Sequence, residues 1–134
     1  MGSPMNELAE YQDIMNRFRK AFVAADRELL VGLLGDEFEW HTHTFDPNQP
    51  ISTGRVLRGV DEMVVELKRR KRTWSNVRSE ALNEYFAPKL ITQSFTISGT
   101  DQGKKFKVAA VDLYTLDRMD RIVEKDTYWK HGGA

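Results

Sequence analysis

The 134-residue sequence contains no cysteine, which excludes disulfide bonds, thiolate metal sites and a cysteine nucleophile. A long apolar run is also missing, because the longest one, residues 29–35, is far too short to cross a bilayer. No basic segment followed by an apolar one opens the chain, as a signal peptide would require. We therefore predict a cytoplasmic protein without a membrane partner. Since a glycine-rich phosphate loop is absent as well, no cofactor is expected.

The sequence also lacks an excess of charge of either sign. Lys and Arg together number 20, and so do Asp and Glu, which gives a net charge of zero. Proteins that hold nucleic acid usually carry a basic excess, so we predict no nucleic-acid partner. The basic run at residues 68–72 resembles a nucleic-acid patch. Cations on the solvated side of a helix C-terminus explain it better.

The composition that remains is that of one globular domain, with 40% hydrophobic and 30% charged residues. We interpret residues 1–5 as a leader or cloning remnant and residues 131–134 as a flexible tail. The single domain is assigned to residues 6–130.

Helices are predicted to come first in this domain. Apolar residues at steps of three and four indicate a helix over residues 6–25. Asp26 can cap a second helix that Gly35 ends, and a third helix starts near Gly59.

Strands are predicted to follow. Residues 37–44 alternate strictly and indicate one early strand, and four more strands joined by short turns follow residue 76. Between the early strand and the third helix, residues 45–59 are rich in turn signals and indicate a loop at a pocket rim. This order predicts an α+β fold with helices on one face of a largely antiparallel sheet.

Asp112 is the first candidate for chemistry. It lies in the middle of residues 106–116, a run with apolar residues on both faces. A carboxylate in such a strand needs a partner, a proton or a cavity, because burying it bare is too costly. If Asp112 has a function in catalysis, it would be an acid or base within a pocket. The alternative is a structural carboxylate bonded to a hydroxyl or a backbone N–H.

The two histidines of the early strand are the second candidate. His41 and His43 share one strand face and can begin a metal site, with Glu39 or Asp46 as a third ligand. Alternation turns both histidines away from the face that carries Trp40, so we predict no metal site. A bulge near the strand end would return His43 to the pocket rim, where it is a second catalytic candidate.

Several local patterns, in order along the chain, resemble the nuclear transport factor 2-like superfamily. They lie at residues 25–34, 36–40, 58–62, 111–114 and 120–124. This superfamily includes SnoaL-like polyketide cyclases, ketosteroid isomerases and limonene epoxide hydrolases. The resemblance implies a cone-shaped, cystatin-like barrel. In it a strongly curved mixed or antiparallel sheet wraps around three N-terminal helices, and an apolar pocket opens between sheet and helices.

The resemblance also implies roles for single residues. Asp112 falls where ketosteroid isomerases keep a carboxylic acid that stays neutral in an apolar site. Thr42 falls where they place the aspartate base, and Phe18 where they place a tyrosine, and neither residue can replace that group. Family members often form dimers through the outer face of the sheet, so a homodimer is implied, with Ala109, Val111 and Leu113 on that face.

We therefore predict an isomerase-, cyclase- or hydratase-type enzyme acting on an apolar carbonyl compound. Its general acid or base is predicted to be Asp112. The predicted ligand-binding residues are Met15, Phe18, Trp40, Thr42, Tyr114 and Trp129. The alternative is a non-catalytic ligand carrier or dimeric interaction module of the same fold.

Overall fold

The computed structural model describes residues 4–43 and 54–131. Three helices and six strands form within these ranges. The helices are α1 (Pro4–Ala24), α2 (Arg27–Leu33) and α3 (Gly59–Thr73). The strands are β1 (Leu34–His43), β2 (Arg55–Arg58), β3 (Trp74–Ala87), β4 (Leu90–Asp101), β5 (Lys104–Leu116) and β6 (Ile122–His131). Residues 1–3 of the predicted leader, 132–134 of the predicted tail and 44–53 of the predicted loop lie outside the described residues.

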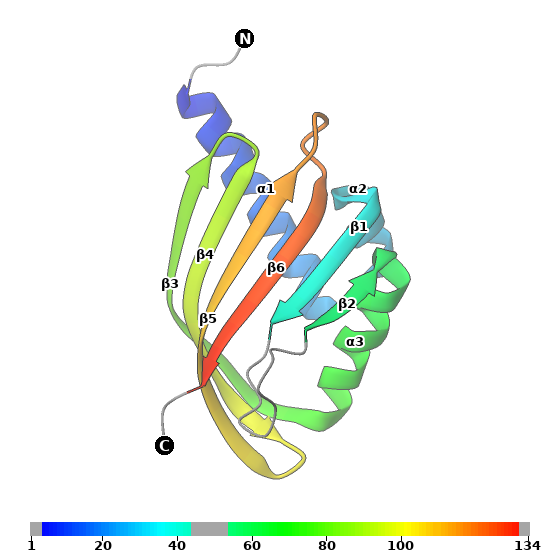
Figure 1. Ribbon diagram of the computed structural model, residues 1–134, viewed down its shortest axis with the longest axis vertical. Coiled ribbons are helices and arrows are strands. Elements are labelled where there is room, and N and C mark those ends of the chain that lie inside the picture. The colour runs from blue at the N-terminus through cyan, green and yellow to red at the C-terminus, as the bar shows by residue number, and fades with distance from the viewer. Residues whose placement is uncertain (1–3, 44–53, 132–134) are drawn as a thin grey trace.

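The strands form one open sheet in the order β2-β1-β6-β5-β4-β3. All neighbouring strands are antiparallel except β1 and β6, which run parallel. The sheet curves strongly, and the helices lie on its concave side, with α1 running across the strands (Figure 1). The α+β prediction is confirmed. One detail is wrong, because residues 55–58 of the predicted loop form β2 and extend the sheet beyond β1.

Two irregularities bend β3, the edge strand beside β4. Its pairing register shifts between Ser75 and Arg78, and again between Glu80 and Asn83. Asn76 and Ala81, which lie within these shifts, have positive φ angles of 55° and 56°. Bulges of this kind bend a strand and increase its twist. The bent strand gives the sheet the curvature that a cavity on its concave side requires.

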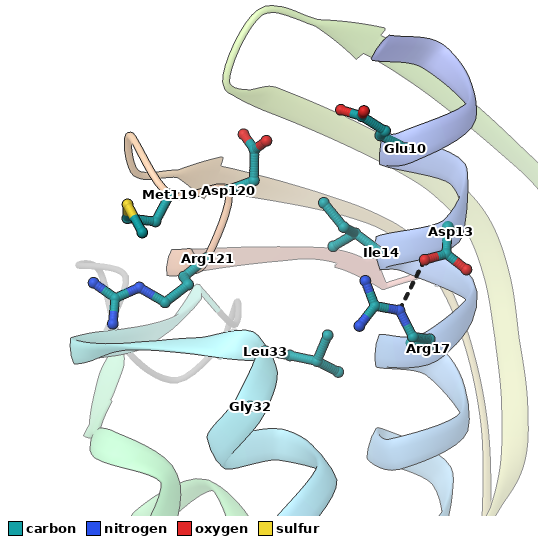
Figure 2. Close-up of a pocket in the computed structure, with 9 residues that line it drawn as sticks. All are labelled: Glu10, Asp13, Ile14, Arg17, Gly32, Leu33, Met119, Asp120 and Arg121. Atoms are coloured by element: carbon teal, nitrogen blue, oxygen red, sulfur yellow. Dashed lines mark hydrogen bonds and ion pairs between the residues drawn. The ribbon is translucent and has the colours of Figure 1, made fainter. Parts of the chain in front are cut away.

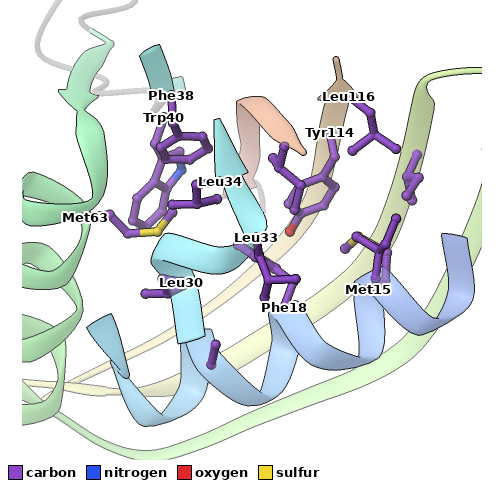
Figure 3. Packing of buried hydrophobic residues seen from close by; sticks show 14 of the residues in the cluster. Met15, Phe18, Leu30, Leu33, Leu34, Phe38, Trp40, Met63, Tyr114 and Leu116 are labelled. Carbon is purple, nitrogen blue, oxygen red and sulfur yellow. The ribbon is translucent and has the colours of Figure 1, made fainter. Parts of the chain in front are cut away.

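The hydrophobic core fills the space between α1, α3 and the sheet. The inward stripe of α1 is almost fully buried, with Met15 at 0% and Phe18 at 1% exposure. From α3, Met63 packs beside Phe38 and Trp40 of β1 (Figure 3). Each large side chain buried in this way contributes about 1.5–3 kcal/mol. No helix among the described residues has the length and apolar character needed to cross a bilayer.

The predicted helix ends are partly confirmed. The side chain of Asp26 caps α2, because it accepts a hydrogen bond of 3.2 Å from the N–H of Leu29. The prediction that Gly35 ends this helix is wrong, since α2 stops at Leu33 and Gly35 lies in β1. A Cβ atom at Gly35 would come within 2.7 Å of the Val123 side chain on β6. Close packing of two strands therefore explains this glycine.

Candidate functional site

A cavity of about 500 Å³ opens on the concave side of the sheet, against α1 and α3. Its wall includes all three tryptophans of the chain. The aromatic side chains that line it are Phe18, Phe22, Trp40, Trp74, Phe95, Tyr114 and Trp129. A cavity of this size, with an apolar wall and a few polar groups, is typical of small-molecule sites.

Asp112 is the acid of this cavity. Alternation along β5 turns Ala110, Asp112 and Tyr114 inward and leaves Val111 exposed. The Asp112 carboxylate is only 4% exposed. Its Oδ1 accepts a hydrogen bond of 2.7 Å from the hydroxyl of Thr127. Its Oδ2 lies 2.9 Å from Nζ of Lys125. The buried carboxylate therefore has both a charged partner and a cavity.

Lys125 is the second buried ionisable group, with 3% exposure. Its Nζ lies 4.9–5.3 Å from the ring centres of Phe22, Trp40 and Tyr114, within the range of cation–π contacts. Burial among these rings lowers the pKa of Lys125, and the charge and hydrogen bond of Asp112 partly offset this effect. The amine is therefore easier to deprotonate than an exposed lysine.

The register of three adjacent strands assembles the network. Asp112 pairs with Thr127 across β5 and β6, and Trp40 pairs with Lys125 across β1 and β6. Nε1 of Trp40 donates a hydrogen bond of 2.9 Å to the hydroxyl of Thr127, and Nζ of Lys125 donates one of 3.2 Å. Since that hydroxyl donates to Asp112, every polar group of the network has a partner.

Tyr114 adds a neutral hydrogen-bond donor. Its hydroxyl lies 3.4 Å from Oδ2 of Asp112. Burial raises the pKa of Tyr114 well above its usual value, and the negative charge of Asp112 raises it further. The phenol therefore stays protonated, and it can donate its single O–H either to Asp112, as it does here, or to an oxygen of a bound ligand.

A second cation, Arg70, lies in the wall formed by α3. Its guanidinium carbon is 4.8 Å from the ring centre of Trp40, 4.6 Å from that of Trp74 and 5.6 Å from that of Trp129. Burial lowers the pKa of Arg70, and a 2.8 Å hydrogen bond to buried Glu66 opposes that effect. Because Arg70 lies in the wall of the cavity, the prediction that residues 68–72 spread over a solvated helix side is wrong at this position.

Towards α1 the wall contains a further polar group. Arg19 donates to Glu84 at 2.5 Å, and the amide of Gln93 donates to the same carboxylate oxygen at 2.7 Å.

Trp74, unlike these residues, has a polar group in the cavity wall that lacks a hydrogen-bond partner in the described part of the chain. Its indole N–H is buried and has no hydrogen-bond partner among the residues that the structure describes. It is a donor that a bound ligand could satisfy.

The structure brings five of the eight predicted site residues to the cavity. They are Phe18, Trp40, Asp112, Tyr114 and Trp129. Met15 and Thr42 are not among the described residues that line it. Met15 is fully buried in the core, and the hydroxyl of Thr42 bonds the backbone of Arg55 at the β1–β2 pair.

His43 lies on the opposite, outer face of the sheet. Its ring stacks on Tyr128 with centres 4.3 Å apart, and its Nε2 is 3.8 Å from Oδ1 of Asp126. β1 continues regularly to His43, so no bulge returns this residue to the cavity. The structure therefore does not bring the second catalytic candidate to Asp112.

The outer face also holds the described residues that come nearest to a metal-ligand set. Donor atoms of His41, Glu124 and Asp126 lie within 4.8 Å of one another. Glu39, one of the third ligands considered from the sequence, forms an ion pair with Arg58. The other, Asp46, lies outside the described residues.

A second, smaller cavity of about 280 Å³ lies between α1, the end of α2 and the β5–β6 turn (Figure 2). Its charged side chains come from the surface, and Arg17 and Asp13 form an ion pair on its α1 side. Asp112 and Lys125 do not line it. The buried pair of Asp112 and Lys125 therefore belongs to the larger cavity.

No protein-family model matches the sequence, and no curated protein is similar to it in sequence. The fold, however, is similar to 283 chains of solved structures. A nuclear transport factor 2-like protein from Burkholderia xenovorans LB400 is 14% identical, with 91% of this chain and 90% of that chain covered and a TM-score of 0.77.

Two further structures carry more specific descriptions. A protein with a ketosteroid isomerase-like fold from Catenulispora acidiphila, in complex with trimethylamine, is 18% identical over 87% of this chain and 85% of its own, with a TM-score of 0.68. A protein from Jannaschia sp. CCS1, provisionally assigned as a SnoaL-like polyketide cyclase, is 10% identical over 89% of this chain and 86% of its own, with a TM-score of 0.65. The chain has the nuclear transport factor 2-like fold, as the resemblance implied.

Proposed function

We propose that the large cavity binds an apolar carbonyl compound and that Asp112 transfers a proton to or from it in an isomerase-, cyclase- or hydratase-type reaction. The observation that carries this proposal is a buried carboxylate at the wall of an aromatic cavity, held 2.9 Å from a lysine. General acid–base catalysis needs a positioned group of this kind within reach of the substrate.

The surrounding donors support a carbonyl ligand. The hydroxyl of Tyr114, the ammonium of Lys125 and the unpartnered indole N–H of Trp74 lie in residues that line the cavity. Removing a proton beside a carbonyl places negative charge on its oxygen, which such donors stabilise. In this reaction the Asp112 carboxylate accepts the proton from carbon, and Lys125 or Tyr114 hydrogen-bonds the oxygen.

The experiment is a thermal-shift screen of hydrophobic ketones, lactones and steroids, followed by a turnover assay of each binder. A ligand that prefers the folded state raises the melting temperature by mass action. We expect one chemical class to bind and to be converted. The Asp112→Asn/Lys125→Met variant, whose cavity keeps no unpaired charge, should bind the same class and lose turnover. Unchanged turnover in that variant would contradict the catalytic role.

A non-catalytic ligand carrier is the second candidate function. The ion pair favours it, because a carboxylate neutralised by Lys125 also satisfies the structural need of a buried acid. Binding of a ligand class without turnover by the wild-type protein would support the carrier.

We further propose that a second copy of the chain covers the outer face of the sheet. Val111 and Tyr128 pair across β5 and β6 and are 37% and 44% exposed. Exposed Lys107 and Lys130 lie towards one end of this face, and Glu124 and Asp126 towards the other. A two-fold axis between the two copies would place the basic end of one copy on the acidic end of the other.

The cysteine-free sequence suits the cytoplasm, the compartment that we propose.

A further inference from the structure

Lys125 differs from every other described lysine. It is 3% exposed, whereas Lys20, Lys68, Lys71, Lys89, Lys104, Lys105, Lys107 and Lys130 are all exposed. Lys125 is one of the residues that line the large cavity. Two of its N–H groups have partners, Asp112 at 2.9 Å and the hydroxyl of Thr127 at 3.2 Å. The amine of Lys125 is thus a positioned primary amine at the surface of an apolar cavity.

An amine attacks a carbonyl only in its neutral form. The surroundings of Lys125 favour that form, since the rings of Phe22, Trp40 and Tyr114 surround Nζ in place of water. Nearby Arg70 also disfavours a second positive charge. Asp112 is close enough to take the proton directly, and the resulting neutral pair loses less solvation in an apolar site than an ion pair does.

We propose that Lys125 forms an imine with an aldehyde or ketone bound in the large cavity, with Asp112 as its proton carrier. The proposal rests on the proposed function, because it takes from it a carbonyl ligand in this cavity. It adds a covalent step that general acid–base catalysis does not require.

The step balances with the groups present. Asp112 takes a proton from Lys125, and the lone pair of Nζ attacks the carbonyl carbon while the carbonyl electron pair moves to oxygen. That oxygen takes the proton from Asp112. Asp112 then accepts a proton from nitrogen and returns it to the hydroxyl, which leaves as water. The product is an iminium beside an Asp112 carboxylate, with the same total charge as the starting ion pair.

The iminium would serve the chemistry proposed above. A positively charged C=N group withdraws electrons more strongly than a neutral carbonyl, so a proton on the adjacent carbon becomes easier to remove. The Asp112 carboxylate, 2.9 Å from the nitrogen, is placed to accept it. No oxidant, reductant or metal takes part in the step.

The test uses 2-naphthaldehyde with sodium cyanoborohydride at neutral pH, on the full chain. Hydride reduces an iminium to a stable secondary amine, and peptide mapping by mass spectrometry locates the naphthylmethyl group. We expect Lys125 to be labelled at least about tenfold faster than Lys71, because Asp112 lies 2.9 Å from the Lys125 amine and can carry protons for each step of imine formation. Lys71 is the matched control, since it also lines the cavity but is exposed.

Variants sharpen the result. Lys125→Arg should lose this fast label, and Lys71→Arg should keep it. Peptide mapping of the wild-type protein gives the answer even if a variant does not fold. Labelling of Lys125 no faster than that of Lys71 overturns the proposal.

Tryptophan fluorescence separates failure of this step from failure of the proposed function. All three tryptophans line the cavity, so a probe that enters it should quench their emission. Quenching without labelling of Lys125 overturns the imine and leaves the ligand-binding cavity supported. If the probe causes no quenching and no labelling, the result counts against both proposals.

Discussion

At the scale of single residues, the pair of Asp112 and Lys125 is the most consequential feature. Both side chains are almost fully buried, and Thr127 and Trp40 complete their hydrogen bonds. A buried ion pair contributes little net stability, but removing one partner leaves an uncompensated charge in an apolar site. The two residues should therefore be strongly coupled in stability.

We expect Asp112→Asn to reduce the free energy of unfolding by about 3–5 kcal/mol, because the Lys125 ammonium loses its counter-charge. The double variant Asp112→Asn/Lys125→Met should recover most of that loss, since Met fills a similar volume without a charge. Urea denaturation of wild type, both single variants and the double variant forms a double-mutant cycle. Additive losses would show that the two residues do not depend on each other.

At the scale of elements, the end of α3 is joined to the cavity through Glu66. This glutamate is 5% exposed and accepts hydrogen bonds of 2.8–2.9 Å from Arg69 and Arg70. Burial alone would raise the pKa of Glu66, but the two arginines more than offset it and lower the pKa to about 2. Glu66 thereby holds Arg70 against the tryptophans of the cavity.

This pKa predicts a pH dependence of stability. The ordinary pKa of the group is 4.5, and in the folded protein it is about 2. Below pH 4.5 the unfolded chain binds a proton that the folded protein still resists. The stabilisation from Glu66 is therefore complete above pH 4.5 and disappears as the pH falls towards 2. Glu66→Gln should be less stable at neutral pH and should lose less stability over that range.

The measurement is urea denaturation from pH 7 to pH 2 for wild type, Glu66→Gln and Glu28→Gln. The last variant is a control that removes one exposed acid from α2. If wild type and Glu66→Gln lose stability in parallel below pH 4.5, another group is responsible for the acid sensitivity.

At the scale of the whole molecule, the sheet has two faces with different chemistry. The concave face carries the cavity, whereas the outer face carries Val111, Tyr128, His43 and the acidic pair of Glu124 and Asp126. Burial raises the pKa of Glu124, and a hydrogen bond to Asp126 raises it further. A basic surface placed against this pair would relieve their repulsion, as the proposed dimer does.

We expect native mass spectrometry to find a dimer for the wild-type chain. Val111→Glu and Tyr128→Glu should each produce a monomer, because they place a charge at the apolar centre of the outer face. Val65→Glu is the matched control, since Val65 is 69% exposed on α3, away from this face. A wild-type monomer at micromolar concentration, or dimers in all three variants, would contradict the proposed interface.

Periodicity in the sequence was sufficient to predict the fold class and the inward direction of most side chains. Asp112, Trp40 and Trp129 reach the cavity because strand alternation depends only on local backbone geometry. The same local rule turned His41 and His43 outward, as the structure has them. The cap at Asp26 is equally local.

Tertiary structure alone decided which side chains meet. Strand alternation puts Lys125 on the same face as Trp129, but its pairing with Asp112 depends on the register of β5 against β6. In the sequence, Arg70 cannot be told apart from the other cations of residues 68–72. Only the packing of α3 against the cavity brings its guanidinium onto the ring of Trp74. Register and helix packing are set by contacts between residues far apart in the sequence, and local periodicity carries no information about those contacts.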